Sequence, residues 1–367
     1  MRVAILSPYA LSVPGGVQEQ VLGLSRVLGA RGHEVLVVAP DAGDTSAHDT
    51  PATLVRLGRR LALPANGSRA PLTLSPRAAR GAERALAAFA PDVVHLHEPG
   101  APVLAWAALL AHRRPTVATF HRAGGGPAVS LTRPLLRRLA RGVDEAVAVS
   151  EAARRLAEAT YALRCEVLFN GIEMERYVAV ARERAAEVTL LFLGRLEARK
   201  GADTAIRAVR EHNATDAPPW RLVVAGDGPE RARLEALAAH DARITFVGRV
   251  SDGAKRSWLR RCHALLAPAT GGESFGLVLL EALASETVVV ASDIEGYREA
   301  VGPHATLAPP GDPRAWARAI ETALAHESPI GVAAAREHAR RWSMAALADA
   351  YLERYERLVA AGGGAHR

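Results

Sequence analysis

The sequence predicts an α/β protein of two domains, each built on a doubly wound parallel sheet. Its 367 residues exceed the usual size of a single domain. Short continuous apolar runs, typical of strands buried on both faces, alternate with segments of helical periodicity. The alternation starts again in the second half, which indicates a second sheet of the same kind.

The expected strands of the first half lie at 2–8, 33–40, 92–99, 115–121 and 145–150. Helical periodicity covers 17–32, where it stops at Gly32, and 102–113. In the second half a helix begins near Asp203, and the expected strands lie at 188–195, 221–228, 243–250, 264–269 and 287–292. The turn at Asn170-Gly171 divides the chain into domains 1–170 and 171–342, and an amphipathic helix is expected over 343–361.

Composition places the protein among cytoplasmic globular proteins. Apolar residues make up 49%, yet no uninterrupted apolar run is long enough to span a membrane. Residues 1–16 end in a Pro-Gly-Gly loop rather than a small-residue cleavage site, so we expect a first strand there and not a signal peptide. Cys165 and Cys262 are far apart in sequence and are expected to be free thiols.

The positive charge is concentrated in the first half. Residues 1–170 carry 20 basic and 13 acidic side chains, whereas residues 171–367 carry 26 of each. This asymmetry predicts an anionic partner for the first half, either acidic lipid, a phosphorylated acceptor or nucleic acid, unless it reflects only a general preference for arginine. Aromatic residues are 5% and do not alternate with the arginine clusters, which disfavours nucleic acid.

Lysine is rare in this chain. Of 46 basic residues only Lys200 and Lys255 are lysine, which suggests that a compact point charge is needed at both positions. Lys200 and Arg195 lie in "GRLEARKG", on a turn between a strand and a helix. Two fixed cations there could neutralise a diphosphate leaving group without requiring a divalent metal. The alternative is a solvated basic loop.

The stretch "GGESFGLVLLEAL", residues 271–283, places Glu273 and Glu281 eight positions apart. We expect Ser274 to cap a helix, so that Glu273 precedes the helix and accepts hydrogen bonds from sugar hydroxyls. The N–H groups of the first turn would face the same ligand, and they belong to Phe275, Gly276 and Leu277. Glu281, about two turns into the helix and near its exposed edge, could accept both hydroxyls of a ribose. The alternative is an acid favourable to the helix dipole followed by a surface glutamate.

Three further positions in the first half are candidates. Gly16, after the first expected strand, lets the backbone approach a phosphate at a helix N-terminus. His121 ends an expected strand and should project into the site. His95 and His97 share one face of another strand, where structural or substrate-lining roles are favoured over metal binding.

Together these motifs resemble retaining family-4 glycosyltransferases, which have the GT-B fold. The likeness covers nearly the whole chain, in order through "VPGGVQ", "NGS", "HLHEPGAP", "ATFH", "GRLEARKG", "GDGP" and "GGESFGLVLLEA". It is strongest to the phosphatidylinositol α-mannosyltransferases, which use GDP-mannose at the cytoplasmic face of the membrane. The resemblance implies two domains facing a cleft, with the last helix crossing back to the first domain.

The resemblance also implies roles for individual residues. Gly16, Arg195 and Lys200 would bind the donor diphosphate, Glu273 the donor sugar and Glu281 the ribose. His121 would lie near the transferred sugar. Asp252 and Lys255, in "VSDGAK", would lie against the base, where Asp252 could accept two hydrogen bonds from guanine. The glycine that ends the helix after Glu281 in the family is Glu286 here.

The acceptor side departs from the family. Ser12, Ala65 and Pro71 stand where its members have other residues, and the matches that remain are Tyr9, Gln18, Asn66 and Ser68. Arg77, Arg80 and Arg84, with the amphipathic segment "LTRPLLRRLARG", predict peripheral binding to an anionic phospholipid surface. The expected acceptor is phosphatidylinositol or a related lipid. The alternatives are a soluble or polysaccharide acceptor with a UDP-sugar donor, and a GT-B isomerase that acts on a nucleotide sugar.

Overall fold

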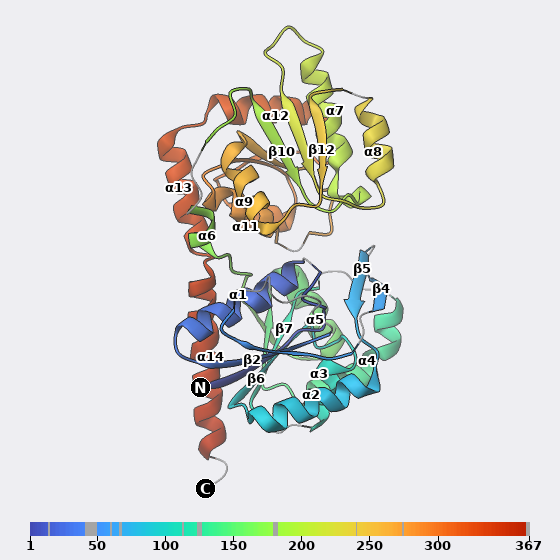
Figure 1. Ribbon diagram of the computed structural model, residues 1–367, viewed down its shortest axis with the longest axis vertical. Coiled ribbons are helices and arrows are strands. Elements are labelled where there is room, and N and C mark those ends of the chain that lie inside the picture. The colour runs from blue at the N-terminus through green and yellow to red at the C-terminus, as the bar shows by residue number, and fades with distance from the viewer. Residues whose placement is uncertain are drawn as a thin grey trace. The chain divides into compact units, whose positions relative to one another are not determined.

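The computed structural model describes residues 1–13, 15–40, 50–58, 61–65, 68–111, 114–122, 127–178, 183–239, 241–273 and 275–364. The chain forms two compact units (Figure 1). Unit 1 comprises Met1–Gly171 together with Met344–Arg367, and unit 2 comprises Ile172–Ser343. Among the described residues, no helix has both the length and the apolar character needed to cross a membrane.

Unit 1 is built on a seven-stranded parallel sheet. Its strands lie in the order β3-β2-β1-β6-β7-β8-β9, so the chain crosses over after β3 to the other side of β1. Their bounds are β1 (Arg2–Leu6), β2 (Glu34–Ala39), β3 (Thr53–Arg56), β6 (Val93–His97), β7 (Thr116–Phe120), β8 (Glu145–Ala148) and β9 (Cys165–Val167). A separate antiparallel hairpin joins β4 (Leu61–Ala65) and β5 (Ser68–Leu72).

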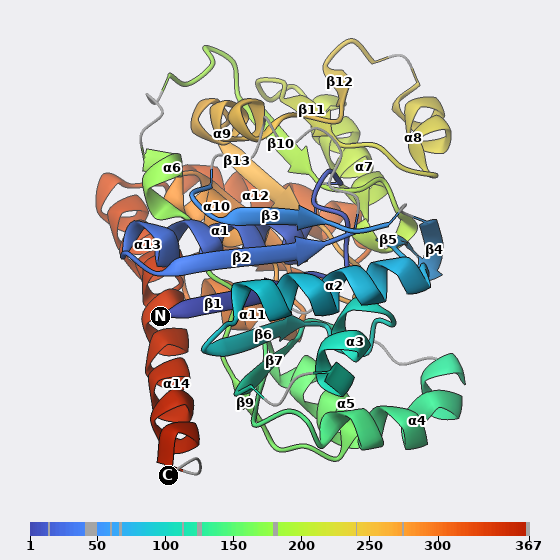
Figure 2. The same ribbon diagram turned by 60° about the horizontal axis from the view of Figure 1, so that its bottom comes forward.

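Helices cover both faces of this sheet. On one face α1 (Gly16–Ala30) packs with α14 (Met344–Gly364), whose buried Leu347, Tyr351 and Tyr355 join the core over β1 and β6 (Figure 1). On the other face α2, α3 and α4 follow one another, and α5 packs on α4 (Figure 2). The bounds of these four are α2 (Pro76–Phe89), α3 (Leu104–Ala111), α4 (Pro127–Ala140) and α5 (Glu151–Tyr161).

Unit 2 repeats the plan with a six-stranded parallel sheet in the order β12-β11-β10-β13-β14-β15. Its strands are β10 (Thr189–Leu193), β11 (Arg221–Ala225), β12 (Ile244–Gly248), β13 (Ala264–Ala267), β14 (Val288–Ser292) and β15 (Thr306–Ala308). Its helices are α6 (Met174–Val178), the 3-10 turn η1 (Ala198–Lys200), α7 (Ala202–Asn213), α8 (Arg231–Ala238), α9 (Asp252–Arg261), α10 (Leu277–Ala284), α11 (Glu295–Val301), α12 (Pro313–Ala325) and α13 (Pro329–Arg340). Helices α7, α8 and α12 share one core with the sheet, while α9 and α10 contact β10, β13 and β14.

The predicted fold class is confirmed, and each expected strand is present. The strands that the sequence analysis missed are short or lie at an edge. β3 has a half-exposed edge pattern, and β9 and β15 have only three residues each. Short edge strands lack the continuous apolar run that identifies a buried strand.

Candidate active site

A glycine contact joins two loops at the carboxyl end of the unit 2 sheet. Gly201 has φ +68°, and a Cβ atom at this position would lie 1.8 Å from the carbonyl oxygen of Pro268. Only glycine therefore allows loop 194–201 to lie this close to the loop that follows β13. The N–H of Thr270 donates to the carbonyl of Arg199 at 2.8 Å, which holds the two loops together.

This loop contact places Lys200 beside Glu273. Lys200 Nζ lies 2.8 Å from Glu273 Oε1, and the guanidinium of Arg199 pairs with the same carboxylate. Arg195 is half exposed and pairs with Glu197 at 3.1 Å. The structure thus brings Lys200 and Glu273 together as an ion pair. The sequence analysis missed Arg199, although it lies in the same motif.

Glu273 lies just before α10, but the helix begins later than expected. Gly276 is the N-cap residue, with φ +88°, and a Cβ there would lie 2.7 Å from the ring of Tyr297. Ser274, the expected cap, lies outside the described residues. Burial of Tyr297, with the charge of Glu273 nearby, raises the pKa of its phenol well above the usual value.

Glu281 is buried, contrary to its expected place near an exposed helix edge. Because α10 starts at Leu277, Glu281 is in its second turn, on a side that packs against α6. Its Oε1 accepts hydrogen bonds from the Tyr177 hydroxyl at 2.6 Å and from Lys255 Nζ at 2.8 Å. Each of the two lysines of the chain therefore pairs with one of the two predicted carboxylates.

Asp252 begins α9 and faces three cations. It lies 3.3 Å from Arg176, 3.4 Å from Lys255 and 3.1 Å from Arg256. Partial burial opposes ionisation of this carboxyl, but the three positive charges outweigh it and lower its pKa. Asp252 is thus ionised and half exposed. Arg176 and Tyr177 come from the short α6, which carries no recognisable motif, and the sequence analysis missed both.

In unit 1, Gly16 is the first residue of α1, after an extended Gly15. Gln18 is buried, and its amide donates to the carbonyl of Ala10 at 3.4 Å. Tyr9 is largely enclosed, and burial, with Glu98 nearby, raises its pKa. Of the other expected acceptor residues, Asn66 lies outside the described residues and Ser68 begins β5.

His121 follows β7 and is held at two atoms. Its backbone N–H donates to Glu98 Oε2 at 2.9 Å, and its Nε2 lies 2.9 Å from His97 Nδ1. Burial lowers the pKa of His121 to about 3, so the ring is neutral. His95 and His97 do share one face of β6. His95 is fully buried against Tyr355 and Thr119, which is a structural position.

The surface of unit 1 carries two rows of arginines. Arg77, Arg80 and Arg84 are exposed on α2, and Arg133, Arg137, Arg138 and Arg141 are exposed on or just after α4. Helix α4 contains no acidic residue, and a surface groove is lined by its arginines and Pro134. Among the described residues, no carboxylate lies within 4 Å of any of these seven guanidinium groups.

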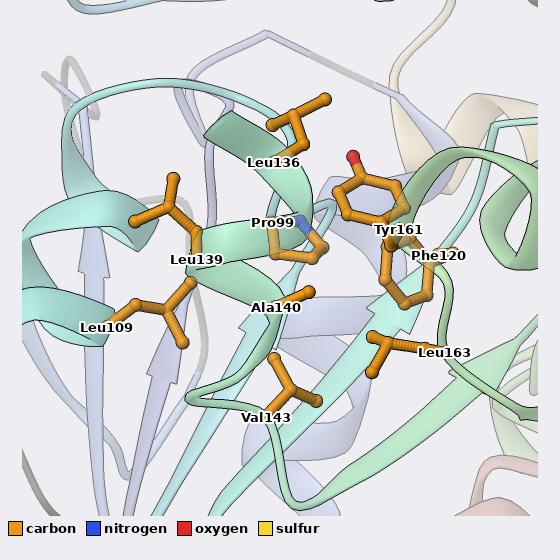
Figure 3. A pocket seen from close by; sticks show the side chains of 9 residues that line it. All are labelled: Pro99, Leu109, Phe120, Leu136, Leu139, Ala140, Val143, Tyr161 and Leu163. Carbon is orange, nitrogen blue, oxygen red and sulfur yellow. The ribbon is translucent and has the colours of Figure 1, made fainter. Parts of the chain in front are cut away.

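The inner side of α4 covers a small apolar cavity. Leu136, Leu139 and Ala140 of α4 face Leu109, Phe120 and Tyr161 across it (Figure 3). The Tyr161 hydroxyl is the one polar side-chain group in this lining, and burial raises its pKa. Such a lining cannot hold a diphosphate, so the cavity is not the donor site. It shows that α4 turns Leu136 and Leu139 inward, while Arg133, Arg137 and Arg138 are exposed.

Comparison with known proteins identifies the family. The family model described as Glycosyltransferase Family 4 matches residues 14–176, and the model for glycosyl transferases group 1 matches residues 174–347. A phosphatidyl-myo-inositol mannosyltransferase of Mycobacterium tuberculosis is 35% identical over 99% of this chain and 98% of its own length. The chain belongs to glycosyltransferase family 4. The sequence-based assignment to this family is confirmed.

This glycosyltransferase is also similar to more distant proteins. A GDP-mannose-dependent alpha-mannosyltransferase of Mycobacterium tuberculosis is 29% identical over 97% of this chain and 96% of its own. The solved sucrose-phosphate synthase of Thermosynechococcus elongatus has a TM-score of 0.75 at 20% identity, covering 98% of this chain and 99% of that one. The two parallel-sheet units of this glycosyltransferase are those of the GT-B fold.

The two family models divide the candidate residues of the glycosyltransferase between them. The group 1 match contains both lysine–carboxylate pairs and Asp252. The family 4 match contains Gly16, His121 and both arginine rows.

Proposed function

We propose that this glycosyltransferase transfers mannose from GDP-mannose, with retention of configuration, to a hydroxyl of phosphatidylinositol or a related lipid at the cytoplasmic membrane face. The observation that carries the proposal is the pairing of Lys200 with Glu273 and of Lys255 with Glu281 within unit 2. The names of two similar proteins support mannose, and one of them supports GDP-mannose as the donor.

Two of the three cations of loop 194–201, Arg195 and Lys200, would stabilise the departing diphosphate. Lys200 pairs with Glu273 at 2.8 Å, and Arg195 pairs with Glu197 at 3.1 Å. Fixed positive groups aimed at developing negative charge lower the barrier without reorganising during the reaction. In this scheme Lys200 turns from Glu273 to the phosphate, no divalent metal is required, and Glu273 becomes able to accept hydrogen bonds from the mannose hydroxyls. The N-terminus of α1 at Gly16 would bind the phosphate from unit 1.

The second pair would hold the nucleoside. Within the described residues, the two hydrogen bonds that Glu281 accepts both reach Oε1, so Oε2 would accept a ribose hydroxyl. Asp252, kept ionised by Arg176, Lys255 and Arg256, would accept hydrogen bonds from N1–H and N2–H of guanine. Uracil has no such pair of donors. The N–H groups of Phe275, Gly276 and Leu277, before and in the first turn of α10, would bind the diphosphate.

His121 would contact the transferred sugar as a neutral hydrogen-bonding group, because burial keeps its ring uncharged at neutral pH. The acceptor hydroxyl would lose its proton to the departing phosphate oxygen on the same face of the sugar, which gives retention. NMR of the product tests this step, since an inverted anomeric centre would contradict it.

The acceptor lipid would be reached through unit 1. Tyr9, Gln18, Asn66 and Ser68 remain the proposed acceptor-side residues. The arginines of α2 and α4 would bind an anionic bilayer surface peripherally. Leu135 of α4, which is 44% exposed, would add an apolar contact beside the α4 arginines.

The decisive experiment incubates the protein with radiolabelled GDP-mannose or UDP-sugars, with and without phosphatidylinositol vesicles. We expect a mannolipid only with GDP-mannose and vesicles, and its loss in Glu273→Ala with wild-type-like activity in Arg207→Ala as the control. Transfer from a UDP-sugar to a soluble acceptor would contradict both the donor and the lipid. Consumption of donor without any acceptor would indicate an isomerase.

A further inference from the structure

Three histidine rings form a column at the carboxyl ends of β6 and β7. His95 stacks on His97 with centroids 4.4 Å apart, and His97 stacks on His121 with centroids 5.1 Å apart. All three side chains lie on the sheet face that α14 covers. His121, the histidine that is proposed to contact the substrate, is therefore the last ring of a stack and not an isolated side chain.

The inner ring of the column is fixed at both nitrogens. His95 Nδ1 lies 2.6 Å from the hydroxyl of Tyr355, and His95 Nε2 lies 2.7 Å from Thr119 Oγ1. Thr119 in turn bonds to the hydroxyl of Tyr351 at 2.8 Å. A fully bonded buried network of this kind is rigid, so His95 forms a fixed floor beneath His97.

His97 has one bonded and one unbonded nitrogen. Its Nδ1 lies 2.9 Å from His121 Nε2, while its Nε2 is buried and has no hydrogen-bond partner in the part of the chain that the structure describes. Burial lowers the pKa of both rings, so both are neutral, and one proton lies on the bond between them.

That shared proton couples the tautomers of the two rings. If His121 donated through Nε2–H, His97 would keep its own proton on Nε2, as a buried N–H without an acceptor. Such orphaned donors are rare in protein interiors. If His97 donates through Nδ1–H, its Nε2 is a bare acceptor, and His121 carries its proton on Nδ1, the nitrogen that is turned away from His97.

We propose that His97 is a positioning residue that donates Nδ1–H to His121 Nε2 and so holds His121 in the tautomer that presents Nδ1–H to the substrate. This inference rests on the proposed role of His121 at the transferred sugar. The ligand atom it predicts is a hydrogen-bond acceptor, such as a sugar hydroxyl oxygen, facing His121 Nδ1.

Two substitutions at one position test the inference. His97→Leu removes the donor, whereas His97→Asn keeps an amide N–H near the place of Nδ1. We expect His97→Leu to lower kcat by about 10- to 100-fold, an effect of the size seen when the hydrogen-bond partner that orients a metal-binding histidine is removed. The KM for GDP-mannose should stay within about twofold, and His97→Asn should recover most of the activity.

Tyr355→Phe is the matched control for a merely structural effect. It removes a buried hydroxyl from the same column but leaves the bond between His97 and His121 intact. We expect it to lower the thermal unfolding temperature while kcat changes by less than about twofold. A loss of kcat as large as that of His97→Leu would overturn the inference.

Imidazole NMR gives a readout independent of turnover. In a long-range ¹H–¹⁵N spectrum, the wild-type His121 ring should be the Nδ1–H tautomer, and His97→Leu should shift it towards Nε2–H. An Nε2–H tautomer in the wild type would overturn the inference, as would equal losses of kcat in His97→Asn and His97→Leu. If instead His121→Ala leaves turnover unchanged, the proposed role of His121 fails, and the spectrum still decides whether His97 sets its tautomer.

Discussion

The two units treat polar groups in opposite ways. Unit 2 encloses charge, because Glu281 is buried, Glu273 is largely enclosed, and each pairs with a lysine at 2.8 Å. Unit 1 encloses a neutral polar column of histidines, while the arginines of α2 and α4 stand on its surface with no carboxylate within 4 Å among the described residues. Buried paired charges suit a small charged ligand with a fixed geometry. Exposed unpaired charges of one sign suit a large anionic surface.

The largest effect should come from removing a partly buried cation of unit 2, Lys200. Lys200→Ala is expected to lower kcat by about a thousandfold, since it deletes a fixed donor at the developing phosphate charge and leaves Glu273 with a weaker set of cations. Steady-state transfer from labelled GDP-mannose measures this. Arg207→Ala, also in unit 2 but exposed and outside the site, is the matched control. A loss below tenfold in Lys200→Ala would refute the assignment of Lys200 to the diphosphate.

Because its histidine column is neutral, unit 1 should lose more stability than unit 2 when the pH falls. Burial, with a smaller effect of nearby His121, lowers the pKa of His95 to about 3, and burial lowers that of His97 well below its usual value. The unfolded chain binds protons at these rings below pH 6.5, whereas the folded unit keeps His95 neutral down to about pH 3 and His97 neutral well below pH 6.5. The stability they contribute is fully present above pH 6.5 and is lost as pH falls through that window. His121, whose pKa burial also lowers to about 3, behaves in the same way, and the three rings together cost about 4 kcal/mol at pH 5.5. Glu98, whose pKa burial raises, acts in the opposite direction but is a single group.

The reactivity of each cysteine reports the unfolding of one unit. Cys165 is buried in unit 1 and Cys262 in unit 2. Labelling with an acid-competent disulfide reagent across a urea series should show Cys165 reacting at lower urea at pH 5.5 than at pH 7.5, with a smaller change for Cys262. His95→Gln should reduce the shift at Cys165 by about a third, since it removes one of the three rings. Equal shifts at both cysteines would contradict the comparison.

Removing the α4 arginines should weaken lipid binding. The variant with glutamine at Arg133, Arg137, Arg138 and Arg141 is expected to float about tenfold less with phosphatidylinositol vesicles, since each basic residue near an anionic surface contributes about 1 kcal/mol before screening. The control removes the same charge from exposed arginines of unit 2, at Arg207, Arg243, Arg249 and Arg318. If both variants lose binding equally, net charge and not α4 determines it.

The smallest effect concerns Glu286, just after α10, where the resemblance predicts a glycine. Glu286 has φ +58°, a left-handed conformation that costs a residue with a side chain about 1 kcal/mol. Its carboxylate also pairs with Arg260 and Arg336 at 3.1 and 2.7 Å. Glu286→Gly and Glu286→Ala lose the same ion pairs. The difference between their free energies of unfolding therefore reports the cost of the backbone conformation at position 286. Urea unfolding followed at Cys262 should show the glycine variant more stable by about 1 kcal/mol, and no difference would exclude strain at this position.

The sequence predicted what local pattern determines. The strands were readable because parallel strands buried on both faces are continuously apolar, and Lys200 and Lys255 were readable because lysine is otherwise absent. The partners of Glu281 were not predictable in this way. Tyr177 lies 104 positions from Glu281 along the chain, and only the packing of α6 against α10 brings the two together. The sequence predicted the histidine column only in part. Alternation placed His95 and His97 on one face of a strand, but it did not indicate that the tyrosines of α14 pack against them.

The contact between Gly201 and the Pro268 carbonyl has a consequence for redesign. Suppose that only one of the two loops were exchanged in order to change the donor specificity. Any side chain introduced at position 201 would then place its Cβ atom 1.8 Å from the carbonyl oxygen of residue 268, so position 201 would have to remain glycine. The segment after β10 and the segment after β13 therefore form one transplantable module. Chimaeras between family members should be joined outside both segments, so that the two segments come from the same parent protein.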